Sequence, residues 1–189
     1  MGAETPRLSR KETQARTRQA LIDAAARAFR RDGFHRASVE AIAAEAGFTR
    51  GAFYANFDGK ESLFLEMMDQ EMRSRFELFT SDLSPRGFAT TYLRKVDEDP
   101  EWTLALLEFT IHAARTPTLR DQLIERNQRL LASVVEAGRA YYPALTAAQA
   151  AAAARFIFAI QSGAGLERAL DPSSIRVEDL EGPLAAATS

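Results

Sequence analysis

Apolar residues recur at spacings of three and four along most of this 189-residue chain, and no stretch alternates cleanly between apolar and polar residues over the length of a strand. Spacings of three and four place apolar side chains on one face of an α-helix. We therefore predict an all-α fold of about nine helices, each burying one face against its neighbours.

Capping residues, glycines and prolines mark where these helices begin and end. Ser9 and Glu12 form a capping box, in which each side chain bonds an otherwise unpaired amide at a helix start, and Gly33 ends the apolar stripe that follows. Similar signals predict two short helices and a long fourth helix, over 38–46, 49–56 and 58–79. Later breaks predict helices near 87–98, 101–115, 118–141, 147–169 and 176–187.

Residues 39–56 have the spacing of a helix-turn-helix. Gly47 lies in the predicted turn, where the backbone needs a positive φ that glycine adopts at little cost. Ile42 and Phe53 are expected to point inward and to fix the angle at which the two helices cross. The second helix would then present its other face to the major groove of DNA.

That face contains donors and small residues in the pattern that groove binding requires. Arg50 can bond guanine through two parallel hydrogen bonds, Tyr54 can donate to phosphate, and small side chains at Gly51 and Ala52 allow a close approach. Residues 16–18 could also reach phosphates, although a solvated helix face explains them equally well. The predicted DNA contacts are Ser38, Thr49, Arg50, Gly51, Ala52, Tyr54, Asn56 and Lys60.

The distribution of charge is consistent with this prediction. The whole chain has a net charge of −2, yet residues 1–60 contain 11 Lys and Arg against 7 Asp and Glu, and residues 61–189 contain 13 against 19. A basic head and an acidic body would orient the protein on a polyanion, although an Arg-rich solvated surface gives the same balance. We predict a three-helix DNA-binding head over 1–60, joined by the long fourth helix to a second helical unit over 61–189.

The run from Gly47 to Leu63, GFTRGAFYANFDGKESL, resembles the signature of the TetR family of bacterial transcriptional regulators. The resemblance covers roughly residues 12–68 and is specific, because many spaced matches fall within one contiguous segment. A weaker similarity to the family lies at residues 165–172. The resemblance implies that Tyr54 contacts the DNA backbone, and it places Asn56 where the family often has histidine.

The resemblance also implies that the unit over 61–189 binds an effector and forms the dimer. It implies a homodimer formed largely by the last two helices, and a repressor that a small effector releases from a palindromic operator. The Met and aromatic stripes of this unit would suit an apolar effector. The candidate effector-pocket residues are Met68, Met72, Trp102, Leu106, Phe109 and His112. The candidate dimer residues are Phe156, Phe158, Ile160 and Gly163. Stripes of this kind are also typical of an ordinary helical core.

Composition excludes several other classes of protein. The chain has no Cys, which excludes disulfides and thiolate metal sites and favours a reducing compartment. We find no Gly-rich phosphate loop and no Ser/His/Asp arrangement, so we expect neither an enzyme nor a cofactor. Glu108 and His112 lie four residues apart but amount to only half of a metal site, so we expect no metal.

Two further expectations concern location and partners. Residues 1–18 contain no apolar run, and polar side chains interrupt the apolar stretch over 147–166. We therefore expect neither an export signal nor a membrane span, and a cytoplasmic location. The alternative function is a helical protein-binding adaptor that does not bind DNA, which the salt dependence of binding would distinguish.

Overall fold

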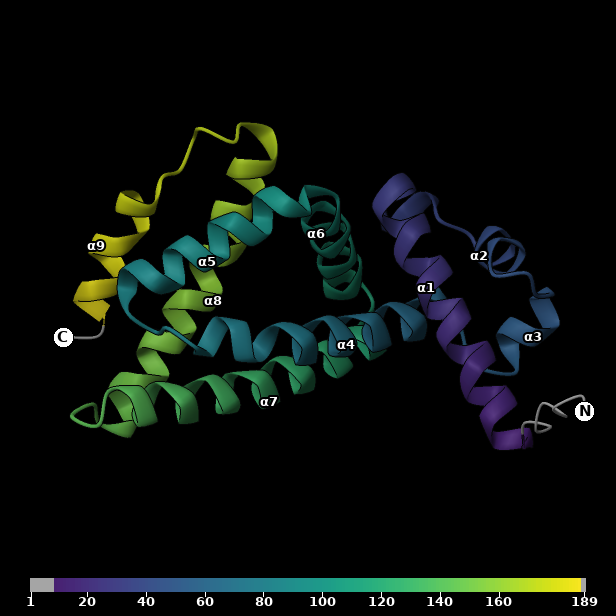
Figure 1. Cartoon of the computed structure of the whole chain (residues 1–189), viewed down its shortest axis with the longest axis horizontal. Coiled ribbons are helices and arrows are strands. Elements are labelled where there is room, and N and C mark those ends of the chain that lie inside the picture. The colour runs from purple at the N-terminus through teal and green to yellow at the C-terminus, as the bar shows by residue number, and fades with distance from the viewer. Residues whose placement is uncertain (1–8, 188–189) are drawn as a thin grey trace, which may run out of the picture. The chain divides into compact units, whose positions relative to one another are not determined.

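A computed structural model describes residues 9–187, and within this range the chain forms nine α-helices and no strand (Figure 1). This confirms the predicted all-α fold. The chain divides into two compact units, residues 1–69 and 70–189, which we call the head and the body. Part of the N-terminal segment considered above as an export signal, residues 1–8, lies outside the described residues.

The head contains α1 (Arg10–Arg36), α2 (Val39–Glu45), α3 (Arg50–Tyr54) and the start of α4 (Lys60–Thr80). α1 begins with the predicted capping box, in which the Ser9 hydroxyl accepts from the Glu12 amide and the Glu12 carboxylate accepts from the Ser9 amide. At Gly33 the backbone leaves the helical region, with φ 76° and ψ 169°. The regular part of α1 therefore ends at the predicted glycine, and a kinked last turn follows.

Aromatic side chains from α1 and α4 form the centre of the head. The rings of Phe29, Phe34 and Phe64 are all fully buried, and their centroids lie 5.0 to 5.7 Å apart. One of these pairs is stacked and two are edge-to-face, and each contributes roughly 1 kcal/mol beyond the burial of its area. Ile42 of α2 and Phe53 of α3 are also fully buried, as predicted.

The body contains α5 (Pro85–Glu98), α6 (Pro100–Arg115), α7 (Pro117–Tyr141), α8 (Ala147–Leu170) and α9 (Val177–Ala187). Three of these helices begin with proline, which suits the first helical position because its missing amide would be unpaired there in any case. Thr146 and Gln149 form a capping box at the start of α8. These local signals explain why the predicted breaks agree with the observed ones to within two residues.

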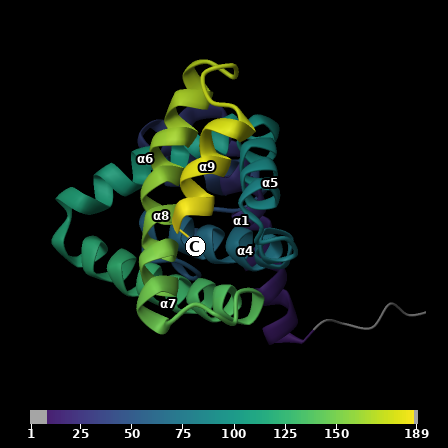
Figure 2. The ribbon, with the colours of Figure 1, turned by 90° about the vertical axis from the view of Figure 1, so that its left-hand side faces the viewer.

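The body core lies where α5, α8 and α9 pack side by side (Figure 2). Tyr92 of α5 donates from its hydroxyl to the backbone carbonyl of Gln161 in α8. Burial raises the pKa of Tyr92 to about 12. A Cβ on Gly165 would lie 2.9 Å from the Tyr92 hydroxyl and 3.0 Å from Thr103, so glycine allows α8 to cross closely at this point. Among the described residues, no helix is both long enough and apolar enough to cross a membrane.

Candidate nucleic-acid interface

Two capped helices and a glycine turn build the helix-turn-helix. The Ser38 hydroxyl accepts from the Ala41 amide at 3.1 Å at the start of α2, and the Thr49 hydroxyl accepts from the Ala52 amide at 3.2 Å at the start of α3. Between them Gly47 has φ 77°. Side chains with a Cβ rarely adopt this conformation, so the turn requires glycine. The predicted turn is therefore confirmed.

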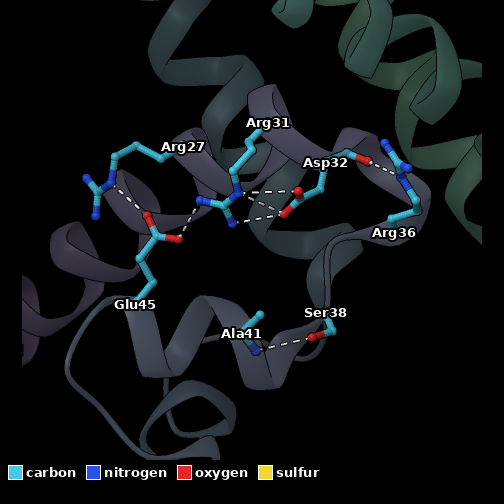
Figure 3. Close-up of polar contacts among 7 residues, drawn as sticks. All are labelled: Arg27, Arg31, Asp32, Arg36, Ser38, Ala41 and Glu45. Atoms are coloured by element: carbon cyan, nitrogen blue, oxygen red, sulfur yellow. Dashed lines mark hydrogen bonds and ion pairs between the residues drawn. The ribbon is translucent and has the colours of Figure 1, made fainter.

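Ion pairs fix α2 against α1 (Figure 3). Glu45, the last residue of α2, accepts from Arg27 Nε at 2.8 Å and from Arg31 Nη1 at 3.2 Å. Arg31 also pairs with Asp32 at 2.9 Å. The hydrogen bond from Arg27, with a smaller contribution from Arg31, lowers the pKa of Glu45. The carboxylate therefore stays ionised while it bridges two turns of α1, which restrains the orientation of α2.

The predicted DNA-contacting face of α3 is exposed. Thr49, Arg50, Gly51 and Tyr54 are all exposed, Tyr54 to 47%, whereas Phe53 on the opposite side is fully buried. The hydroxyl and guanidinium groups are hydrogen-bond donors that suit phosphates and base edges. Because no side chain projects at position 51, the helix surface beside these donors is open to a close approach.

Arg50 already has a partner in the free protein. Its Nη1 atom lies 3.0 Å from Glu40 Oε1, and its guanidinium carbon lies 5.4 Å from the centroid of the Tyr54 ring. A hydrogen bond with Tyr54 and the charge of Glu40 raise the pKa of Arg50. Glu40 was not among the residues predicted to form the site. The only signal in the sequence is its position in the first turn of α2, which does not reveal that it faces α3.

Asn56, a predicted DNA contact, faces the protein instead. It is half-buried, and its Nδ2 donates to the Ala52 carbonyl at 2.8 Å, which satisfies an unpaired carbonyl near the end of α3. The backbone carbonyl of Asn56 accepts from the Arg18 guanidinium. Arg18 also pairs with Glu66 at 3.3 Å and lies 4.1 Å from the centroid of the Phe57 ring. Both side chains hold the end of α3 against α1 and α4 rather than extend into solvent.

Lys60, another predicted contact, is also directed into the protein. Its ammonium donates to the backbone carbonyls of Phe34, His35 and Ala37, at 2.9, 3.1 and 3.2 Å. These carbonyls follow the kink at Gly33, where the helical hydrogen bonds of α1 end. A lysine ammonium has three donors, and all three are used here. Lys60 therefore caps the end of α1 in the free protein, and its three donors are not directed at the predicted phosphate.

The body has an apolar cavity of about 50 Å³ among α5, α7, α8 and α9. Its lining includes Leu83, Phe88, Gly138, Tyr142, Ile157 and Leu184. The Tyr142 hydroxyl is already bonded to the Leu83 carbonyl at 2.9 Å, so the cavity offers a largely apolar surface.

None of the six residues predicted to form an effector pocket lines this cavity. Trp102 and Phe109 are buried in the packing of α6, at 6% and 0% exposure, and Met72 is exposed. Met68, Leu106 and His112 are half-buried. Apolar spacing identifies the buried face of a helix, but it does not show where the packing leaves space.

The predicted dimer residues on α8 fall into two groups. Phe156 and Gly163 are exposed, and Leu166 and Leu170 extend the same apolar surface toward the end of α8. Phe158 is half-buried. Ile160 packs against the core of its own body, so it is a core residue rather than a surface one.

Comparison with known proteins gives matches in both units. The sequence profile described as "Bacterial regulatory proteins, tetR family" matches residues 21–67. The profile described as "BetI-type transcriptional repressor, C-terminal" matches residues 85–187. The second match alone covers more than half of the chain.

Individual relatives agree with these profiles. The regulator AcrR of Shigella flexneri is 33% identical over 125 residues, which is 66% of this chain and 50% of AcrR. The nicotine-responsive repressor HdnoR of Paenarthrobacter nicotinovorans is 29% identical over 175 residues, which is 86% of this chain and 89% of HdnoR. In four of the matches, of which AcrR is one, the aligned region spans only 34% to 62% of the relative's own length.

A solved structure gives the same assignment over the full length. NalD, the secondary repressor of a multidrug efflux pump in Pseudomonas aeruginosa, superposes with a TM-score of 0.59 at 28% identity and covers 93% of this chain and 97% of NalD. The helix-turn-helix of the head, the helical body and the two profile matches therefore lead to one assignment. The chain belongs to the TetR family of bacterial regulatory proteins.

Proposed function

We propose that this protein is a transcriptional repressor that binds a palindromic operator as a homodimer, and that a small apolar effector releases it. The observation that carries this proposal is the exposed face of α3, where Arg50 and Tyr54 lie next to each other and Gly51 leaves the helix surface beside them without a side chain. A helix held rigidly by its neighbours, with donors around a low surface, suits insertion into a major groove.

The proposed contacts divide between the two helices of the motif. α3 enters the major groove with Arg50 on base edges, and Tyr54 and Thr49 donate to phosphates. α2 crosses the backbone with Ser38 at its start, and Gly51 and Ala52 permit the close approach. Asn56 and Lys60 are left out of the contact set because their donors already bond the protein.

The exposed surface of α8 supports a dimer. One recognition helix contacts too few base pairs for useful specificity, so a second copy is needed to read a second half-site. Leu170 is 73% exposed, and Phe156 and Leu166 are 36% and 43% exposed on the same helix. A two-fold axis along α8 would bury these apolar side chains against their own copies.

The apolar cavity of the body supports an apolar effector. A volume of about 50 Å³ is far below the roughly 300 Å³ or more of a ligand site for an ordinary organic molecule, so binding there has to move the surrounding helices. Leu83 of the lining lies three residues after the end of α4, a helix whose first residues belong to the head. Displacement of this wall by an effector would therefore shift the end of α4. An effector that binds the displaced conformation more tightly would then change the population of conformations of the DNA-binding unit through α4.

The proposal is tested by selecting bound duplexes from fragments of the source genome at about 150 mM salt, where weak non-specific binding is suppressed. The wild type is compared with an Arg50→Ala, Tyr54→Ala double variant. The control is Arg129→Ala, which removes an exposed arginine paired with Glu125 on α7. We expect the wild type and the control to enrich one palindrome that the double variant loses. If none of the three proteins enriches any sequence at any salt concentration, the protein is not a sequence-specific DNA binder and the adaptor function takes precedence.

Arg50 alone provides a finer test. If its guanidinium bonds a guanine, Arg50→Ala should cost about 1 to 3 kcal/mol of binding free energy on the selected duplex and relax the preference at one position in each half-site. Competition binding with duplexes substituted at each position measures this. An unchanged preference at every position would remove Arg50 from base readout.

A further inference from the structure

Arg50 is the proposed base-reading side chain, and a carboxylate from the neighbouring helix holds it in the free protein. Arg50 Nη1 lies 3.0 Å from Glu40 Oε1, and the two side chains are 63% and 59% exposed. The pair bridges α2 and α3 on the same side of the head as Tyr54, whose ring lies 5.4 Å from the guanidinium carbon. A DNA contact through Arg50 therefore has to break the ion pair between Arg50 and Glu40.

The strength of this pair determines which DNA contacts can displace it. An ion pair between exposed side chains changes an equilibrium constant by about fivefold or less. A bidentate contact with guanine discriminates by about fivefold to more than a hundredfold. A guanine can therefore displace Glu40, whereas a single exposed contact with a phosphate gains little more than the pair already provides.

The charge of Glu40 strengthens this difference. In a docked helix-turn-helix the first helix lies across the DNA backbone, so a carboxylate in the first turn of α2 lies close to phosphates. When Arg50 leaves Glu40, this carboxylate loses its compensating charge and is repelled. A guanine offsets that repulsion with two hydrogen bonds, and a random sequence does not.

Glu45 shows that the two acidic side chains of α2 have different surroundings. Glu45 faces α1 and is held by Arg27 and Arg31, whereas Glu40 faces α3 and pairs with Arg50. Removing the charge of Glu40 therefore acts on the reading surface without breaking the contacts that fix α2.

We propose that Glu40 is a specificity-determining residue that holds Arg50 away from phosphates and releases it to guanine. This inference rests on the proposed function, because it requires DNA binding through α3. Its consequence is unusual for a binding residue. Neutralising Glu40 should strengthen binding overall and weaken discrimination.

The test uses the full chain and two duplexes of equal length, the palindrome selected by the wild type and a scrambled version of it. Dissociation constants are measured for wild type, Glu40→Gln, Arg50→Ala and the double variant over a range of salt concentrations. Asp58→Asn is the matched control, because Asp58 is an exposed acidic residue of the head whose removal changes the net charge by the same amount.

We expect Glu40→Gln to tighten binding to the scrambled duplex by about three- to tenfold and to the palindrome by less. The specificity ratio, which is the dissociation constant for the scrambled duplex divided by that for the palindrome, should therefore fall. The salt dependence on the scrambled duplex should steepen by about one phosphate contact, because the freed Arg50 now reaches the backbone. In the Arg50→Ala background, Glu40→Gln should change both duplexes equally. Asp58→Asn should also change both equally.

Three results would overturn the inference. One is a specificity ratio that stays unchanged or increases in Glu40→Gln. Another is an equal fall in the specificity ratio when Glu40→Gln is introduced into the Arg50→Ala variant. The third is a change of the preferred base at one position, which would make Glu40 itself a base contact. If the wild type binds both duplexes equally, the proposed function fails as well, so the two failures can be told apart.

Discussion

At the scale of single residues, the α3 surface contains two side chains with different expected effects on binding. Arg50 offers a planar set of donors that matches a guanine edge, whereas Tyr54 offers one hydroxyl on an exposed ring. A phosphate is present at every base step, so a hydroxyl that donates to it fixes position without reading sequence.

Tyr54→Phe should therefore weaken binding to all duplexes alike, by about 1 to 2 kcal/mol for one hydrogen bond to a charged acceptor. Titration of the selected palindrome and of single-base variants measures this. Tyr141→Phe on α7 is the control, since Tyr141 is similarly exposed, at 44%. A loss confined to one base position would contradict the backbone role.

Lys60 gives a second prediction at this scale. Its ammonium bonds three carbonyls that follow the kink in α1, and Met would keep the aliphatic stem while losing all three bonds. Lys60→Met should lower the free energy of unfolding by about 1 to 3 kcal/mol, as measured by urea titration. The salt dependence of DNA binding should stay the same. A shallower salt dependence with unchanged stability would instead identify Lys60 as a phosphate contact.

The sequence predicted single residues well only where local geometry decides their role. The hydroxyls of Ser38 and Thr49 accept from backbone amides three residues later, and Gly47 forms the turn through its own backbone conformation. Capping and turn rules were therefore sufficient to predict these roles. Lys60 bonds carbonyls more than 20 residues earlier in the chain, and Glu40 meets Arg50 across a turn. Contacts of this kind depend on the tertiary arrangement, which periodicity does not specify.

At the scale of elements, helix boundaries were predictable because each has its own chemical cause. Ser9, Thr146 and the prolines at 85, 100 and 117 act through the backbone groups that a helix start leaves unpaired. The cavity that we propose as the effector site was not predictable in the same way. A cavity is what remains after all side chains have packed, and no local pattern reports it.

The link between α1 and α2 gives a pH-dependent prediction. Arg27 and Arg31 lower the pKa of Glu45 below its ordinary value of 4.5, so the folded head favours the ionised carboxylate. The resulting stabilisation is present above the unfolded pKa and is lost as the pH falls through the lowered folded pKa. The pair is largely exposed, so its contribution should be about 0.5 to 1 kcal/mol.

The free energy of unfolding of Glu45→Gln should therefore lie below that of the wild type at neutral pH, and the difference should disappear as the pH falls below the lowered folded pKa of Glu45. Glu125→Gln on α7 is the control for loss of an exposed pair. A difference that is constant over this range would mean that the bridge does not act through the charge of Glu45.

At the scale of the whole molecule, the proposed function requires two heads to read two half-sites, so the dimer surface should control the affinity for the operator. Deleting α9 would be a poor test of that surface. Leu180 and Leu184 of α9 are 8% and 2% exposed and belong to the core of their own body. Their removal would unfold the body together with any interface, so a substitution on the exposed side of α8 is the better choice.

Phe156→Glu places a charge on that surface while leaving the core of the body intact, because the Phe156 side chain is already 36% exposed. If α8 forms the interface, burying two uncompensated carboxylates at the two-fold axis should weaken dimerisation at least tenfold. Light scattering across a dilution series measures this, and binding to a full palindrome should weaken while binding to an isolated half-site should not. Ile124→Glu is the matched control, because Ile124 is an apolar residue of α7 with 47% exposure. A monomer produced by Ile124→Glu, with Phe156→Glu still dimeric, would move the interface from α8 to α7.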